Sequence, residues 1–82
     1  MNTADLLSRI APEPGKMGGQ PLIRGRRITP AMVLKLLANG ASRKAILEAY
    51  PTLESQDIDA CLLYAARLSE VAAEEGITVA AE

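Results

Sequence analysis

Few residues in this 82-residue sequence could take part in covalent or metal chemistry. The sequence contains no His, and its one cysteine, Cys61, lies in an apolar stretch. Metal sites of His/Cys type, His-dependent catalytic triads and disulfide frameworks are therefore excluded. Asp57 and Asp59 are two residues apart on a predicted helix, so their side chains point in different directions and do not converge on a cation. We expect no metal, no cofactor and no catalysis, and we interpret Cys61 as a small buried hydrophobic residue.

The charged residues are distributed unevenly along the chain. Residues 1–44 contain eight basic residues against two acidic ones, and so carry +6. Residues 45–82 contain one basic residue against eight acidic ones, and so carry −7. This separation predicts two surfaces that stay apart in the folded chain, one for an anionic partner and one for a cationic partner. The alternative is that the two halves neutralise each other inside the fold.

The basic half supplies the candidate DNA-binding residues. These are Lys16, Arg24, Arg26, Arg27, Arg43 and Lys44. The first four belong to a segment rich in Gly and Pro that we predict to form a β-hairpin, and a two-stranded ribbon that carries Arg side chains can lie in a DNA groove. The last two begin a predicted helix, where the helix dipole favours an external anion such as phosphate. The alternative is a solvated hairpin whose arginines form salt bridges with the acidic helix.

The acidic half supplies the candidate partner-binding residues. These are Glu70, Glu74 and Glu75, close to the end of the last predicted helix. A nuclease that binds RNA needs a basic cleft, and an acidic helix can occupy such a cleft as a phosphate mimic. We therefore expect this helix to contact a partner protein.

The segment 10–29 is predicted to be a basic β-hairpin region. Its density of Gly and Pro forbids a helix through most of it. Leu22-Ile23 and Arg27-Ile28 flank Gly25, which can supply the positive φ of a tight turn, so we predict that these two pairs are the strands. For Leu6–Ile10 a strand and a helical turn both fit the local pattern, and we favour the strand.

Three helices are predicted over residues 30–75. Thr29-Pro30 is an N-cap followed by proline at the first helical position, which starts a helix that runs to about Asn39. Ser42 caps a second helix that runs from Arg43 to about Tyr50. The third helix starts near Glu54 or Ser55 and runs to about Glu75, and residues 76–82 are predicted to be a tail. Apolar residues recur at three- and four-residue steps along the third helix, so one stripe can serve both the core and a dimer contact. The stripe contains Ile58, Cys61, Leu62, Ala65, Leu68 and Ala72.

These elements predict one mainly α-helical domain over residues 1–82, a tri-helical helix-turn-helix (homeodomain-like) bundle with a short N-terminal β-hairpin. The third helix begins with acidic residues, so we do not expect it to read a DNA groove in the usual way. The sequence contains neither Phe nor Trp. A core without large rings in so short a chain is small, and we therefore expect a homodimer.

The longest apolar run is far shorter than the roughly 18 residues that a membrane span requires, so we expect no membrane contact. The first residues, Met1 to Asp5, lack the basic region of a secretory signal. We expect a cytoplasmic protein.

Several stretches of the sequence resemble the domain of unknown function family 433 (DUF433), described as the antitoxin component of a toxin-antitoxin pair. The stretches are 18–28 (GGQPLIRGRRI), 38–42 (ANGAS), 49–53 (AYPTL) and Asp57-Ile58. The residues that match the family's hairpin and inter-helix turn are Pro21, Ile23, Arg24, Gly25, Arg27, Ile28, Gly40 and Ser42. Arg26 departs from the small polar residue that is common in the family, and Glu54 departs from the usual capping Ser or Thr. The resemblance covers about residues 10–68 and implies a homeodomain-like fold, a partner toxin similar to a PIN-type ribonuclease, and binding to operator DNA.

We therefore expect an antitoxin-like protein that binds and neutralises a cognate toxin and binds its own operator DNA. Two alternatives stay open. One is a DNA-binding repressor that acts alone, and the other is a protein-interaction module without a nucleic-acid partner. An adjacent second open reading frame separates the first alternative from the antitoxin, and absence of DNA binding at low salt supports the second.

Overall fold

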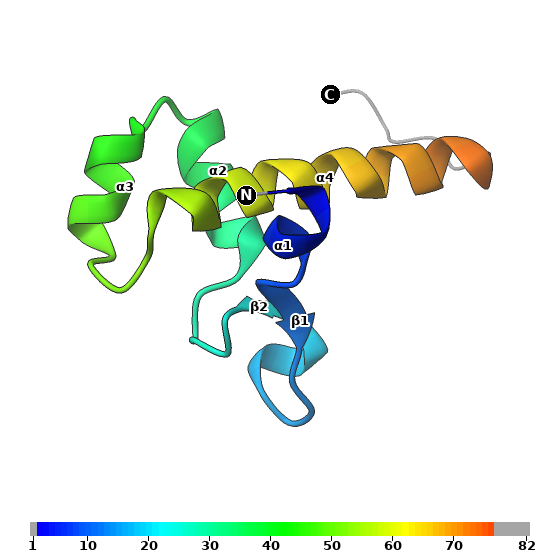
Figure 1. Ribbon diagram of the computed structural model, residues 1–82, viewed down its shortest axis with the longest axis horizontal. Helices are drawn as coiled ribbons and strands as arrows, with labels where there is room; N and C mark the ends of the chain where they lie inside the picture. Colours follow the sequence, from blue (N-terminus) through cyan, green and yellow to red (C-terminus); the bar gives the residue numbers. More distant parts are fainter. Residues whose placement is uncertain (1, 77–82) are drawn as a thin grey trace.

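The structure is a computed structural model and describes residues 2–76. Its elements in chain order are α1 (Thr3–Leu7), β1 (Ile10–Pro12), the short 3-10 helix η1 (Met17–Gly19), β2 (Pro21–Ile23), α2 (Pro30–Ala38), α3 (Arg43–Ala49) and α4 (Ser55–Glu74). The described part is thus mainly helical, with a two-stranded antiparallel hairpin near its N-terminus (Figure 1). Most of the predicted tail, residues 77–82, lies outside the described residues.

The strand predicted over Leu6–Ile10 is wrong, because Leu6 and Leu7 belong to helix α1, the next two residues form a turn, and only Ile10 lies in a strand. The side chain of Asn2 caps α1 and accepts a hydrogen bond from the amide of Asp5 at 2.8 Å. Leu6 and Leu7 on this helix are half-buried. The N-cap and the burial of these two leucines thus favour a helix over the strand that the local sequence pattern also allowed. β1 begins only at Ile10.

The hairpin forms, and the predicted strand Leu22-Ile23 is confirmed as part of β2, but its partner is β1 and not the predicted Arg27-Ile28. β1 pairs with β2 in an antiparallel register that places Ile10 opposite Ile23 and Pro12 opposite Pro21. The turn predicted at Gly25 is present, with φ of +48° at Arg24 and +70° at Gly25. Two positive φ values in succession give the tight turn that matches strand twist. Two hydrogen bonds close this turn, from the Arg26 amide to the Ile23 carbonyl and from the Ile23 amide to the Ile28 carbonyl, each at 3.0 Å, and the chain then enters α2.

The three predicted helices are confirmed as α2, α3 and α4, with ends within one or two residues of the predictions. Thr29 caps α2 by accepting from the Met32 amide at 3.2 Å, and Ser42 caps α3 by accepting from the Ala45 amide at 3.1 Å. Gly40 ends the first of these helices with φ of +91°. The local capping signals therefore fix these boundaries.

The core lies around the first half of α4. Ile23 from the hairpin, Val33 from α2 and Ile46 from α3 pack with Ile58 and Cys61 of α4, and each of these side chains is buried. The second half of α4 projects beyond the other elements (Figure 1). The apolar stripe continues along this projection, where Leu68 is 52% exposed.

Within residues 2–76, no helix is both long enough and apolar enough to cross a membrane.

Candidate partner-binding surface

The start of α4 is built around a buried carboxylate. Asp57 is fully buried, and its two oxygens accept hydrogen bonds from Arg24 at 2.8 and 3.0 Å and from Arg9 at 2.9 Å. The backbone amide of Glu54 donates to the same carboxylate at 2.8 Å. Asp57 thereby joins α4 to the turn after β2 and to the segment between α1 and β1. A buried carboxylate that accepts this many hydrogen bonds holds these segments together.

The protonation of this cluster follows from its contacts. Burial by itself would raise the pKa of Asp57, but the hydrogen bonds from Arg24, the Glu54 amide and Arg9 outweigh it and hold the pKa below its ordinary value. A hydrogen bond to Glu54 and another to Asp57 raise the pKa of Arg9. The hydrogen bond to Asp57 likewise raises the pKa of Arg24. Asp57, Arg9 and Arg24 are therefore ionised at neutral pH.

The predicted separation of the two charged halves is wrong for the arginines that meet α4. Arg9 and Arg24 pair with Asp57, and Arg43 pairs with Asp59. These contacts match the alternative in which the basic half is neutralised by the start of the acidic helix. Because a neutralised and partly buried guanidinium is poorly placed to bind phosphate, Arg24 and Arg43 are weakened as DNA-binding candidates.

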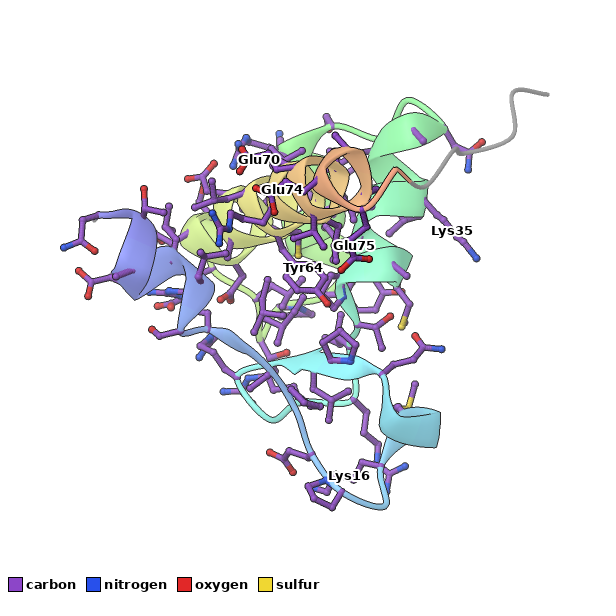
Figure 2. The ribbon with its side chains drawn as sticks, turned by 90° about the vertical axis from the view of Figure 1, so that its right-hand side faces the viewer. Lys16, Lys35, Tyr64, Glu70, Glu74 and Glu75 are labelled. Atoms are coloured by element: carbon purple, nitrogen blue, oxygen red, sulfur yellow. The ribbon has the colours of Figure 1, made fainter. Side chains whose placement is uncertain are left out.

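The other basic candidates divide into paired and unpaired residues. Lys16 pairs with Glu13 at 2.9 Å, and Lys44 lies 4.0 Å from Glu48. Arg26 and Arg27 are exposed and form no ion pair with any residue in the range 2–76. Lys16 sits at the far end of the hairpin, away from α4 (Figure 2). The structure therefore does not bring the six candidates into one basic surface.

Sequence reasoning missed Arg9 as a partner of Asp57. This residue lies 48 positions before Asp57, and its side chain is only 16% exposed. No local signal distinguishes it from a solvated arginine. The sequence did contain one signal for a structural role of Asp57. It lies three residues after Glu54, which is the spacing of a capping box at the start of a helix.

The three candidate glutamates lie on the projecting part of α4 but face two sides. Glu70 and Glu74 point away from the hairpin, whereas Glu75 lies on the hairpin side together with Tyr64 (Figure 2). Glu70 also lies 3.6 Å from Arg67 in an exposed pair. The acidic surface is therefore formed by Glu70 and Glu74, and Glu75 belongs to the apolar side of the helix.

Cys61 is fully buried, as the sequence predicted. Burial, together with the charge of nearby Asp57, raises the pKa of its thiol to about 12. The thiol is therefore protonated and shielded at neutral pH, and it is not a nucleophile in the folded chain.

The surface of residues 2–76 has no pocket, and these residues contain no cluster of His, Cys, Asp or Glu that could hold a metal ion. The distinctive feature of this surface is the projecting half of α4. Besides its acidic residues it carries exposed apolar ones, Leu68 at 52% and Val71 at 40%. Such a surface can bind a macromolecule, whereas it offers no enclosure for a small one.

The fold and surface are those of a small, mainly helical protein in which a hairpin is tied to the start of a long projecting helix. The family model described as protein of unknown function (DUF433) matches residues 10–65, and the chain belongs to this family. The chain is also similar to a DUF433 member protein from Anabaena variabilis ATCC 29413, whose crystal structure was solved at 2.00 Å resolution. The two are 32% identical with a TM-score of 0.71, over 88% of this chain and 71% of the other. A comparison with curated proteins found no match.

Proposed function

We propose that this protein is a non-catalytic, antitoxin-like protein of the cytoplasm that binds a partner toxin through the projecting half of α4. The observation that carries the proposal is that the second half of α4 projects beyond the other elements (Figure 1) and exposes Glu70 and Glu74 on one side (Figure 2). Carboxylates on a projecting helix can reach a basic surface of another protein. The resemblance of the sequence to the antitoxin family supports a toxin as this partner.

Inhibition would be steric and electrostatic. A ribonuclease of the PIN type must hold an anionic backbone, so its cleft attracts carboxylates. The end of α4 is narrow enough to enter a cleft, and Glu70 and Glu74 lie one turn apart on the same side of it. These two carboxylates would occupy positions that RNA phosphates take.

The test is co-purification of the chain with the product of its neighbouring small gene, followed by an RNA-cleavage assay. We expect the double variant Glu70→Gln, Glu74→Gln to weaken inhibition of the partner at least tenfold. The matched control is Glu48→Gln, which removes an exposed carboxylate from α3. Equal inhibition by the double variant and the control would overturn the electrostatic part of the proposal.

Binding of operator DNA is the second candidate function, and the exposed residues Arg26 and Arg27 favour it. In a homeodomain-like arrangement of α2, α3 and α4, the groove-reading helix would be α4. Its first turn is occupied by the Asp57 cluster, so the turn after β2 is the better contact with DNA. If two phosphate contacts are made, replacing both arginines with Ala should reduce the salt slope of log K in a gel-shift series by about 2.

If the wild-type protein shows no gel shift at low salt, DNA binding is ruled out, and the alternative of a protein-interaction module without a nucleic-acid partner is favoured. A gel shift together with no stable complex with the neighbouring gene product would instead favour a repressor that acts alone. These two outcomes separate the antitoxin from its alternatives.

A further inference from the structure

In the part of the chain that the structure describes, apolar residues on the projecting half of α4 stay exposed, and the spacing of the residues on this side is the same in both directions. We infer that this side binds a second copy of the same chain, with the two α4 helices antiparallel. The residues concerned are Tyr64, Leu68, Val71 and Glu75, which follow one another at steps of four, three and four. Steps of this kind keep side chains on one side of a helix.

The exposure of these residues changes along the helix. Cys61, one turn earlier, is fully buried in the core, and Tyr64 is half-buried. Leu68 and Val71 are 52% and 40% exposed. Tyr64 and Glu75, at the two ends of the series, both point to the hairpin side of the helix (Figure 2). The series is therefore a continuation of the core-facing stripe into a region where residues 2–76 do not cover it.

Antiparallel packing makes this stripe complementary to itself. With a two-fold axis between Ser69 and Glu70, Leu68 faces Val71 of the second copy, and this contact occurs twice. Tyr64 faces Glu75 of the second copy, where the phenolic hydroxyl can donate to the carboxylate. An interface in which the same patch serves both subunits is the usual form of a symmetric dimer.

Charge selects the antiparallel orientation over the parallel one. A parallel pair would place Glu75 beside Glu75 of the second copy at the end of an apolar contact, and like charges there repel. The antiparallel pair separates these two carboxylates by the full length of the contact. Glu75 also pairs with no cation within residues 2–76, so it is available to a donor from another chain.

The size of the contact sets its strength. From Tyr64 to Glu75 the helix is about 18 Å long, slightly more than three turns. A standard stable interface buries about 800 Å² on each partner, and two short helix faces bury less than that. We therefore expect a reversible dimer with a dissociation constant in the micromolar range, on the order of 10 μM.

This inference does not depend on the proposed toxin-binding function, because Glu70 and Glu74 lie on a different side of α4 (Figure 2). A dimer formed through the apolar side would leave both acidic sides exposed. The two proposals are also tested by different variants, so each can fail alone.

The experiment is sedimentation equilibrium of the full chain from 1 μM to 1 mM. We expect wild type to change from monomer to dimer over this range, and Leu68→Glu to remain a monomer at 1 mM with unchanged helicity in circular dichroism. The matched control is Leu62→Glu, which alters a leucine that is 45% exposed but lies about 120° around the same helix. This control should dimerise like wild type.

A charge exchange tests the orientation. In the double variant Leu68→Lys, Val71→Glu, an antiparallel pair brings each new cation opposite a new anion of the second copy, so dimerisation should recover at least tenfold relative to Leu68→Glu. A monomeric wild type at 1 mM, or a Leu68→Glu variant that dimerises like wild type, would overturn the inference. A double variant that stays monomeric would overturn the antiparallel arrangement.

Discussion

The two halves of α4 share one apolar periodicity but have opposite environments. In the first half, Asp57, Ile58 and Cys61 are fully buried. In the second half, Leu68 and Val71 are exposed although they continue the same pattern. Within residues 2–76, the other elements enclose only the first half. Amphipathic periodicity therefore predicts which side of a helix is apolar, but it does not say whether the cover comes from the same chain.

The charged residues differ in the same way. Carboxylates of the first half, Asp57 and Asp59, pair with arginines from distant segments of the chain. In the second half, Glu70 pairs with Arg67 on the same helix, at 3.6 Å, and with no other cation of residues 2–76. The first half is thus tied into the fold by electrostatics as well as by packing, and the second half is free to act on something outside it.

The largest expected effect is the loss of the buried carboxylate in the first half. Asp57→Asn should lower the free energy of unfolding by about 3 kcal/mol, because Arg9 and Arg24 lose the anion that neutralises them and the helix start loses its acceptor. Urea denaturation followed by circular dichroism measures this loss. The matched control is Asp59→Asn, which removes an exposed pair with Arg43 and should cost less than about 1 kcal/mol. Equal costs for the two variants would contradict the structural role of Asp57.

Acid should act on the same group. The pKa of Asp57 is lowered in the folded chain, so its ionised form stabilises the fold at any pH above the ordinary value of 3.8. As pH falls below this value toward the depressed pKa, the unfolded state binds the proton more readily and stability is lost. We expect urea midpoints of wild type to fall below about pH 4 more steeply than those of Asp57→Asn. Parallel curves for the two proteins would show that Asp57 does not carry this acid sensitivity.

These two predictions concern the part of the structure that the sequence did not reveal. Helices α2 and α3 follow from Thr29, Ser42 and Gly40, whose effects are local, and their ends could be predicted closely. The Asp57 cluster depends on Arg24 and Arg9, which lie 33 and 48 positions away. Neither helix propensity nor local spacing predicts contacts between such distant residues. The net charges of the two halves were therefore correct, but the prediction that their charged groups form two separate surfaces was wrong.

The candidate site divides in the same way. The position of Glu70 and Glu74 on an exposed helix was predictable, because an acidic turn near a helix end is ordinarily solvated. The separation of Glu75 from the other two was also within reach of the spacing, because successive residues of a helix lie about 100° apart around its axis. What the spacing does not give is where the core ends along the helix, and therefore that Leu68 and Val71 beside Glu75 are exposed.

A smaller effect is expected when charge is removed from the second half. The double variant Glu70→Gln, Glu74→Gln should change the free energy of unfolding by no more than about 0.5 kcal/mol, because both side chains are exposed and away from the core. Thermal denaturation of the variant beside wild type measures the difference. A decrease of 2 kcal/mol or more in the free energy of unfolding would mean that the second half of α4 is also part of the folded core. The proposed difference between the two halves would then be wrong.

The smallest expected effect concerns the rate at which a thiol on α4 reacts with a reagent. This rate reports whether the position of the thiol is buried or exposed. Cys61 is fully buried with a pKa of about 12, so it should not react with a thiol reagent at pH 8 while the chain is folded. Leu68→Cys in a Cys61→Ala background places the only thiol seven residues later, two turns along the same stripe. At 1 μM, where we expect monomers, that thiol should react as fast as it does in urea. Rapid labelling of native Cys61 would place the boundary earlier in the helix, and slow labelling at position 68 would show that something already covers the projecting half.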